Sequence, residues 1–374
     1  MRIGINALYL LPGKVGGSEI YIRNLVRWLP RVGRDDTFVI FVNRESAGVF
    51  EAISPGVEVV NCAVNAASRP ARILYEQFVL PFRARRSGVD ILLSAGMTAP
   101  FFSPARSYVM VYDLQHVNQP QNFGRLQLLF LKAIIYMSAR SSHGVLTLSE
   151  KSKSDIVRHY NIAPGRVHVT HLASDESSFH RQDARDVAEI RKKHDLPKRF
   201  ILYIASSLPH KNYERLLAAF KVVKAKDRPV KLVLIGARSY GHDAISKKIA
   251  ELGLEKEVVF LGWLPFEDIP LIYAASELFV FPSLHEGFGI PVLEAMATGV
   301  PVVCSRIEPL GEVAGDAALY VDPLNAGAMA EGMLKVLKDK SLREGLIEKG
   351  LARAALFSWE KTAKATLRAL KDKE

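Results

Sequence analysis

Short apolar runs alternate with longer amphipathic segments from one end of this 374-residue sequence to the other. Seven runs rich in Val, Ile, Leu and Phe lie in the first half, at residues 2–8, 38–43, 57–64, 90–95, 107–113, 144–149 and 167–172. Six more lie in the second half, at 200–206, 231–237, 258–263, 278–283, 301–305 and 318–322. Continuous apolar strands separated by helices are typical of parallel sheets covered on both faces. The pattern therefore predicts an α/β protein with doubly wound parallel sheets.

A polar interval separates the two series of strands. Residues 174–198 carry many charges and no apolar run, so we expect a linker followed by the first helix of a second domain. The length of 374 residues also favours two domains over one core. We place the first domain at residues 1–178 and the second at 179–357. The tail from residue 358 has the pattern of an amphipathic helix that includes Trp359.

The composition is that of a soluble globular protein, with 49% hydrophobic and 24% charged residues. The two cysteines, Cys62 and Cys304, lie in apolar runs, so we expect buried thiols and no disulfide framework. The N-terminus has the pattern of a strand and turn, not that of a signal peptide. The longest apolar run, residues 126–137, is interrupted by Lys132 and is too short to span a bilayer. We therefore expect a cytoplasmic protein.

The net charge of +11 is concentrated between Arg83 and Arg166, where eleven Lys or Arg residues face four Asp or Glu residues. Such a surface favours anionic ligands, namely phosphates, nucleic acid or acidic lipid headgroups. A basic face that serves only solubility is the alternative. The chain has neither an arginine-rich tail nor a regular aromatic-basic pattern, so we expect no nucleic-acid partner.

A glycine-rich turn follows the first predicted strand. Gly13, Gly16 and Gly17 precede an amphipathic helix, and glycines there let a ligand approach the free amides of the helix N-terminus. These features suit a phosphate or diphosphate. The G-x-G-x-x-G spacing of dinucleotide sites is absent, and similar turns occur where nothing binds, so both interpretations stay open.

A second candidate loop follows the first predicted strand of the second domain. Ser206 and Ser207 supply hydroxyls, and His210 and Lys211 precede a helix that Asn212 is predicted to cap. A lysine at a helix N-terminus is repelled by the helix dipole unless an anion lies between them. A diphosphate is such an anion, although a solvated surface lysine is the simpler interpretation.

The stretch HEGFGIPVLEAMATG, residues 285–299, places two glutamates around a predicted helix start. Pro291 fits the first position of that helix, which would put Glu294 in its first turn and Glu286 in the loop before it. Gly287, Phe288 and Gly289 form a permissive loop with accessible amides. Both acids suit helix capping, but carboxylates only accept hydrogen bonds, so they also suit the vicinal hydroxyls of a ribose or hexose.

The segment PSLHEGFGIPVLEAMATGVPVV resembles the signature of family 4 retaining glycosyltransferases, in which seven residues separate two glutamates. Further similarities are GGSEIYIRNL at the glycine loop, TLSEKSKSDI, the PHKN stretch and the tail FSWEKTAKATL. The resemblance implies a GT-B fold, that is, two Rossmann-like domains facing a central cleft. It also implies that residues 358–374 return to the first domain, which binds the acceptor, while the second binds the sugar nucleotide.

The resemblance implies roles for individual residues. Glu294 would bind the nucleotide ribose, Glu286 and the loop 287–289 would contact the transferred sugar, and Lys211 would neutralise the leaving diphosphate. The predicted donor-binding set is completed by Gly16, Gly17, Ser206, Ser207 and His210. No metal and no cofactor are expected besides the GDP- or UDP-linked sugar substrate.

Two positions depart from the family pattern. His210 stands where many members have an arginine, which leaves part of the leaving-group stabilisation in question. The strand at 107–113 ends in Tyr112-Asp113 where the family often has His-Asp, and His116 follows three residues later. Asp113 and His116 are candidates to contact the sugar or the acceptor hydroxyl. The alternative for His116 is a structural histidine in a strand-to-loop turn.

The sequence therefore predicts a retaining hexosyltransferase, with mannose as the expected sugar and a glycan or lipid-linked acceptor, in polysaccharide or lipopolysaccharide synthesis. The alternatives are another GT-B enzyme such as a nucleotide-sugar epimerase, or a basic nucleotide- or nucleic-acid-binding protein without turnover. The arginine-rich segment 69–88 and the apolar segment 126–137 suit either peripheral contact with an anionic membrane, at its inner face, or plain packing on the sheet.

Overall fold

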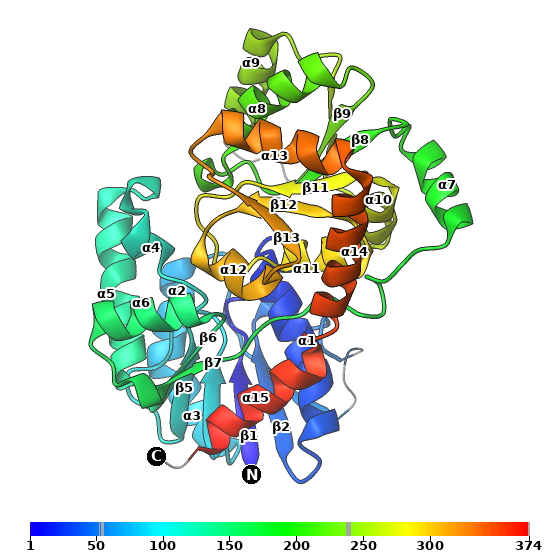
Figure 1. The fold of residues 1–374 in the computed structure, drawn as a ribbon. Helices are drawn as coiled ribbons and strands as arrows, with labels where there is room; N and C mark the ends of the chain where they lie inside the picture. Colours follow the sequence, from blue (N-terminus) through cyan, green and yellow to red (C-terminus); the bar gives the residue numbers. More distant parts are fainter. Residues whose placement is uncertain (52, 54–55, 237–240, 373–374) are drawn as a thin grey trace. The chain divides into compact units, whose positions relative to one another are not determined.

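The computed structural model describes residues 1–51, 53, 56–236 and 241–372 (Figure 1). The chain divides into two compact units, Met1–Leu172 with Trp359–Glu374 (unit 1) and Ala173–Ser358 (unit 2). Each unit is built on one parallel sheet, and Figure 1 shows helices on both sides of each sheet. Among the described residues, none of the helices combines the length and the apolar character that crossing a bilayer requires.

The sheet of unit 1 has seven parallel strands in the order β3-β2-β1-β4-β5-β6-β7. Its central strand β1 is paired on both sides, with Ile5 opposite Ile40 of β2 and Leu93 of β4. The strands are β1 (Arg2–Asn6), β2 (Thr37–Val42), β3 (Val57–Asn61), β4 (Ile91–Ser94), β5 (Arg106–Met110), β6 (Gly144–Thr147) and β7 (Val167–Val169).

The helices of unit 1 bury apolar stripes against this sheet. They are α1 (Gly17–Val32), α2 (Arg69–Phe78), α3 (Leu80–Arg86), α4 (Gln115–Asn118), α5 (Arg125–Ser141), α6 (Glu150–Tyr160) and α15 (Trp359–Lys371), with short turns η1 (Arg44–Ser46), η2 (Pro120–Asn122) and η3 (Pro164–Arg166). Helix α3 packs over β2 and β4, whereas α5 and α6 pack over β5, β6 and β7. The C-terminal α15 packs against α1, and its Thr362 hydroxyl donates to the His171 carbonyl at 2.6 Å.

The sheet of unit 2 has six parallel strands in the order β10-β9-β8-β11-β12-β13. Its central strands β8 and β11 pair directly, with Leu278 opposite Ile201 and Phe279 opposite Leu202. The strands are β8 (Phe200–Ile204), β9 (Lys231–Ile235), β10 (Val258–Gly262), β11 (Leu278–Phe281), β12 (Val302–Ser305) and β13 (Ala318–Val321).

Helices also cover the second sheet. They are α7 (Ala184–Lys193), α8 (Tyr213–Lys226), α9 (His242–Leu252), α10 (Ile269–Ala275), α11 (Ile290–Ala297), α12 (Glu308–Ala314), α13 (Ala326–Lys338) and α14 (Lys340–Ala354), with turns η4 (Pro209–Lys211) and η5 (Phe266–Asp268). Helices α8 and α13 pack side by side, and α11 packs between α12 and α14.

The predicted α/β architecture is confirmed, because each of the thirteen apolar runs contains a strand. Most predicted runs extend beyond the C-terminal end of the observed strand, since apolar residues continue into the loops after the ladder pairing has ended. Ala237, in the run 231–237, lies outside the described residues. The predicted helices after residue 174 and after residue 358 are α7 and α15, and both cysteines are free and buried.

The strand order locates the place where ligands bind in such sheets. In both units the chain first builds outward in one direction and then crosses over to build in the other, between β1 and β4 in unit 1 and between β8 and β11 in unit 2. The loops that leave the carboxyl ends of these neighbouring strands diverge, which opens a crevice at the sheet edge. Functional side chains are therefore sought after β8 and β11, and after β1 and β4.

Candidate functional site

Lys211 and Glu286 meet at the crossover point of unit 2. Lys211 ends the turn η4 after β8, and Glu286 lies in the loop that joins β11 to α11. The Nζ atom of Lys211 lies 2.6 Å from Oε1 of Glu286, and the two side chains are 16% and 12% exposed. The Lys211 ammonium also lies 5.5 Å from the ring centroid of Phe281, a distance suited to a cation–π contact. The sequence predicted that both residues belong to one site, but not that they form an ion pair.

Main-chain contacts fix the position of Lys211. The Tyr203 hydroxyl, from β8, donates to the carbonyl oxygen of Lys211 at 2.6 Å. The backbone amide of Leu284 donates to the carbonyl of His210 at 2.8 Å, which joins the loop after β8 to the loop after β11. The lysine and the glutamate therefore start from connected backbone segments, which is what a preorganised charge pair requires.

Asn212 does not cap α8 through its side chain, so that prediction is wrong. Its backbone is left-handed, with φ 61° and ψ 35°, and its amide nitrogen donates to the carbonyls of Pro282 at 2.9 Å and Pro323 at 2.7 Å. The side-chain amide is buried next to carbonyls that need hydrogen-bond donors. Hydrogen bonds to these buried carbonyls contribute more to stability than a side-chain cap on an accessible helix end. Asn212 thereby ties the lysine turn to the loop that carries Glu286.

Glu294 lies one residue deeper in its helix than predicted. Helix α11 begins at Ile290 after Gly289, so Pro291 is its second residue and Glu294 its fifth, beyond the first turn. The side chain is only 8% exposed, and its Oε2 atom accepts a hydrogen bond from the Tyr273 hydroxyl of α10 at 3.1 Å. The helix dipole stabilises acids mainly in the first turn, so helix capping does not explain the buried carboxyl of Glu294.

Burial changes the charge state of Glu294. Loss of hydration raises the pKa of the carboxyl to about 7, and the hydrogen bond from Tyr273 only partly offsets this effect. The group therefore titrates near neutral pH, a property that is common in functional sites. A ligand that donates hydrogen bonds to the ionised carboxylate would lower this pKa again.

Gly289 fixes the turn between the two glutamates. Its φ of 109° is unfavourable for any residue with a side chain, and an added Cβ would lie 2.5 Å from Cδ2 of Leu310 in α12. The glycine thus lets α11 begin directly against α12. A side chain at position 289 would therefore displace the first turn of α11 or Leu310.

Gly289→Ala is expected to lower the free energy of unfolding of unit 2 by roughly 1–3 kcal/mol, from backbone strain alone. The contact with Leu310 adds to this cost, and donor binding should weaken because the loop shifts. Denaturant unfolding followed by circular dichroism measures the effect. Gly311→Ala is the matched control, because a Cβ on Gly311 in α12 meets nothing within 4 Å. Equal stability of the two variants would contradict the packing described for Gly289.

The remaining predicted donor residues of unit 2 lie close to the ion pair in the chain. Ser206 is partly exposed, whereas Ser207 and His210 are buried, so the imidazole of His210 is not a freely extended phosphate ligand. Phe288 is also buried, and its ring packs edge-on against Phe357 with centroids 6.0 Å apart. Phe288 therefore contributes packing, which leaves ligand contacts in this loop to its backbone and to Glu286.

A cavity of about 610 Å³ lies between the turn η4 and helix α9. Ser207 and Asn212 line it together with Lys247, Lys248 and Glu251 of α9. Lys211, Glu286 and Glu294 do not line this cavity. We place the candidate functional site at the charge pair, because this pair joins the loops after β8 and β11, the two strands that flank the crossover point.

In unit 1 the glycine loop after β1 is open. Gly16 has a φ of 60° and precedes α1, and a Cβ on Gly16 or Gly17 would meet nothing within 4 Å. A hydrogen bond fixes the end of the loop, because the Tyr9 hydroxyl donates to the Ser18 carbonyl at 2.8 Å. The accessible glycines are consistent with close approach of a ligand to this helix N-terminus.

Asp113 and His116 follow β5 in unit 1 but have different surroundings. Asp113 accepts a hydrogen bond from the amide of Gln115 at 3.0 Å and is partly exposed. His116 is 3% exposed, its Nε2 atom lies 2.9 Å from the Tyr160 hydroxyl of α6, and burial lowers its pKa. These contacts favour a structural role for His116. Of the two residues, the partly exposed Asp113 is the better candidate to contact a sugar or acceptor hydroxyl.

Sequence reasoning missed three residues that hold the site. Tyr203 fixes the backbone of Lys211, Tyr273 bonds to Glu294, and Asn212 connects the two loops. Each tyrosine lies inside an apolar run, where an aromatic residue normally indicates core packing. Only Asn212, the last residue of the PHKN stretch, gave a signal in the sequence, and that signal suggested a helix cap.

Two parallel sheets with the same crossover, one of them carrying the charge pair, define a GT-B glycosyltransferase fold. Solved structures share this fold along the whole chain. The crystal structure of HepE from Anabaena with UDP and glucose covers 100% of both chains with a TM-score of 0.78 and 19% identity. WaaG, a glycosyltransferase involved in lipopolysaccharide biosynthesis, covers 99% of both chains with a TM-score of 0.77 and 16% identity.

Sequence comparisons identify the family. Residues 15–177 match the model for Glycosyltransferase Family 4, and residues 186–353 match that for Glycosyl transferases group 1. O-antigen chain mannosyltransferase B of Escherichia coli is 34% identical over 71% of this chain and 70% of its own length. O-antigen chain mannosyltransferase RfbU of Salmonella typhimurium is 26% identical over 77% and 78%. The chain therefore belongs to the family 4 retaining glycosyltransferases, and the epimerase and binding-only alternatives are not favoured.

Proposed function

We propose that this enzyme transfers mannose from a GDP- or UDP-linked donor to a glycan or lipid-linked acceptor during the synthesis of a surface polysaccharide. The proposal for the sugar rests on the mannosyltransferase names of the relatives described above. The proposal for the site rests on one observation, the Lys211–Glu286 pair at the crossover point of unit 2, with the buried Glu294 in the helix that follows the Glu286 loop. A cation for the diphosphate and two carboxylates for hydroxyls match the parts of a sugar nucleotide.

Donor binding is proposed to exchange the partners of the ion pair. Lys211 leaves Glu286 and binds a diphosphate oxygen, which frees Glu286 to accept hydrogen bonds from the hydroxyls of the sugar. Glu294 accepts hydrogen bonds from the ribose, and the backbone of loop 287–289 supplies further donors. Ser206 completes the proposed donor contacts of unit 2, whereas the buried Ser207 and His210 support the turn that carries Lys211. Gly16 and Gly17 of unit 1 are a separate proposed phosphate contact.

The transfer itself breaks the bond between the anomeric carbon and the diphosphate oxygen. The acceptor oxygen forms its bond on the same face of the sugar, and its proton passes to the departing diphosphate, so the configuration is retained. Negative charge develops on the leaving oxygen, and Lys211 with the helix N-termini stabilises it electrostatically. We propose that these groups do so without a metal and without a further cofactor.

We propose that the second predicted domain, residues 179–357, binds the donor and that the first, residues 1–178 with 358–374, binds the acceptor. Asp113 is the proposed acceptor contact, and His116 supports its loop through Tyr160. A lipid-linked acceptor would be presented at the inner face of the cytoplasmic membrane, so we propose a peripheral location there.

A thermal-shift screen against GDP-, UDP- and ADP-sugars tests the proposal and names the donor. A ligand at one hundred times its dissociation constant stabilises the folded state by about 2.7 kcal/mol, so one sugar nucleotide should raise the Tm clearly. GDP-mannose is the expected ligand if the sugar is as proposed, with UDP-linked sugars as the comparison. No shift with any sugar nucleotide, or equal shifts with all, would contradict a selective donor site.

A further inference from the structure

We propose that unit 1 carries a docking surface for an anionic phospholipid bilayer. This docking surface consists of the outer face of α5, the loop at Phe102 and the outer face of α2 and α3, and its main apolar side chains are Phe78, Phe82, Phe102, Leu126, Leu129 and Phe130. The proposed lipid-linked acceptor gives the surface a purpose and in that respect the inference rests on the proposed function. All residues of the docking surface lie in unit 1.

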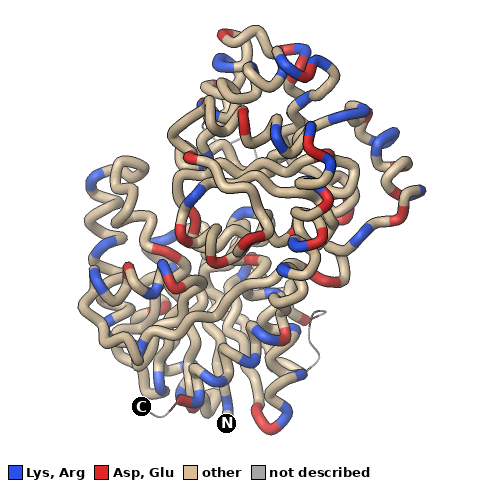
Figure 2. Tube along the Cα trace, viewed as in Figure 1, with Lys and Arg blue, Asp and Glu red and all other residues tan. Residues whose placement is uncertain are grey.

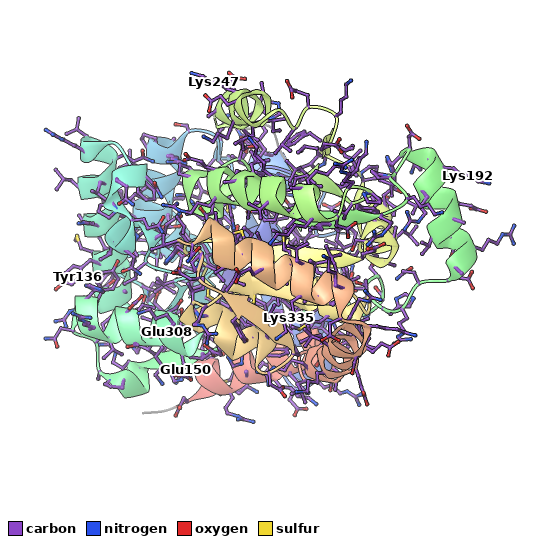
Figure 3. The ribbon with its side chains drawn as sticks, turned by 45° about the horizontal axis from the view of Figure 1, so that its top comes forward. Tyr136, Glu150, Lys192, Lys247, Glu308 and Lys335 are labelled. Atoms are coloured by element: carbon purple, nitrogen blue, oxygen red, sulfur yellow. The ribbon has the colours of Figure 1, made fainter. Side chains whose placement is uncertain are left out.

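Helix α5 is apolar on two sides. Ile134, Ile135 and Ala139 face the core, where they pack against the strands of unit 1. On the solvent side Leu126, Leu129, Phe130, Tyr136 and Met137 are 42–85% exposed. They recur at intervals of three, four and seven residues, so they form one stripe along the helix. Figure 3 shows Tyr136 at the outer margin of this helix. A surface helix normally turns charged and polar residues to the solvent, so this stripe requires a partner.

Hydrogen bonds join this stripe to α2. The side-chain amide of Gln77 donates to the Ala99 carbonyl at 2.9 Å and accepts from the Phe101 amide at 2.9 Å. The Ala99 amide in turn donates to the Ser138 hydroxyl of α5 at 3.1 Å. The loop that carries Phe102 is therefore held between the two helices. Phe102 is 82% exposed, and Phe78, directly after Gln77, is 68% exposed, so the apolar surface continues from one helix to the other.

The docking surface carries cations and almost no acids. Residues 69–86 and 125–141 contain eight Lys or Arg residues and one acid, Glu76, which is buried. Figure 2 shows blue and no red segments along α5. On α5 the cations Arg125 and Lys132 lie seven residues apart, on the same side as the exposed stripe. A cation at an anionic surface strengthens binding about fivefold.

A bilayer accepts this combination better than a protein does. Apolar side chains enter the boundary of the acyl chains while neighbouring Arg and Lys side chains reach the headgroups. A second copy of the chain paired through the same surface would place cations opposite cations, which is unfavourable. The charge complementarity therefore selects anionic lipid as the occupant.

Vesicle co-sedimentation without donor or acceptor tests the inference. The full chain should sediment with vesicles of phosphatidylcholine and phosphatidylglycerol, and much less with pure phosphatidylcholine. Leu126→Gln/Leu129→Gln/Phe130→Gln and, separately, Arg125→Gln/Lys132→Gln should each reduce binding about tenfold or more. The matched controls in unit 2 are Val222→Gln/Leu324→Gln/Leu356→Gln for exposed apolar residues and Lys335→Gln/Lys338→Gln for exposed cations. Both controls should bind as the unmodified protein does.

The outcomes separate this inference from the proposed function. Equal binding by the surface variants and their controls, or equal binding to neutral and anionic vesicles, would overturn the docking surface. A change in oligomeric state in the surface variants without vesicle binding would also overturn it, in favour of a protein partner. The donor-induced Tm shift, measured without vesicles, should be unchanged in the surface variants, which shows that they fold and that the donor site is independent. Loss of that shift in the unmodified protein would contradict the proposed function and leave the vesicle result valid.

Discussion

Lys211→Ala is expected to reduce the rate of sugar transfer about 10²–10³-fold, the range for removal of one preorganised group that stabilises developing charge. The substitution removes the cation proposed to bind the leaving diphosphate, so kcat should fall more than donor affinity. Glu286→Ala should abolish measurable transfer, because the hydroxyls of the sugar lose the carboxylate proposed to accept their hydrogen bonds. Initial rates with the donor identified by the thermal-shift screen provide the measurement.

Lys224→Ala is the matched control for Lys211→Ala. Lys224 lies in α8 and forms an ion pair of the same length, with Nζ 2.6 Å from Oε2 of Glu257, and the side chains are 19% and 26% exposed. Loss of this pair should leave transfer within about twofold of the unmodified enzyme, since an ion pair of this kind contributes little to stability. Comparable rates for the two lysine variants would show that Lys211 has no special function.

Glu294→Gln should abolish the pH dependence that the buried carboxyl gives to the free energy of unfolding of unit 2. The folded pKa of about 7 lies above the ordinary value of 4.5, so the folded state holds the proton more tightly than the unfolded state. The free energy of unfolding is therefore highest below about pH 4 and falls as the pH rises to 7, by on the order of 3 kcal/mol. Glutamine cannot ionise, so the variant should lack this decline. Denaturant unfolding at pH 5 and pH 8 measures it.

The same carboxyl should make donor binding depend on pH in the opposite direction. Ribose hydroxyls donate to the ionised form, so the dissociation constant should rise as the pH falls from 8 to 6, by at most tenfold per unit. The diphosphate diester of a sugar nucleotide does not titrate in this range. Calorimetric titration of the unmodified enzyme and Glu294→Gln tests the point. A variant with undiminished affinity and the same pH profile would exclude Glu294 from the ribose site.

The sequence was sufficient for the strands and their arrangement because the physical signal is local and strong. Runs such as residues 278–281 are apolar at every position, which fits only a strand that is covered on both faces. The helix starts were less accurate, as α11 shows. Pro291 suits the first or the second position of a helix, and the deciding factor is Gly289, whose conformation depends on the contact of this turn with Leu310.

The site was predictable in its residue types but not in its connections. The spacing of Glu286 and Glu294 and the lysine of PHKN identified the groups. The Lys211–Glu286 pair joins residues 75 positions apart, and the bond between Tyr273 and Glu294 joins residues 21 positions apart. Such contacts depend on the strand order, because β8 and β11 become neighbours only when the sheet has formed. The conformation of Asn212 likewise depends on two distant carbonyls.

The closed Lys211–Glu286 pair also has a consequence for selectivity among anions. Inorganic phosphate can bind the lysine only by displacing a carboxylate 2.6 Å away, and its own negative charge repels that carboxylate. In the proposed binding mode a complete sugar nucleotide satisfies both groups at once, because its diphosphate replaces the glutamate and its sugar replaces the lysine. We therefore expect the enzyme without donor to bind free phosphates weakly, and to release the leaving diphosphate more readily once the sugar has gone.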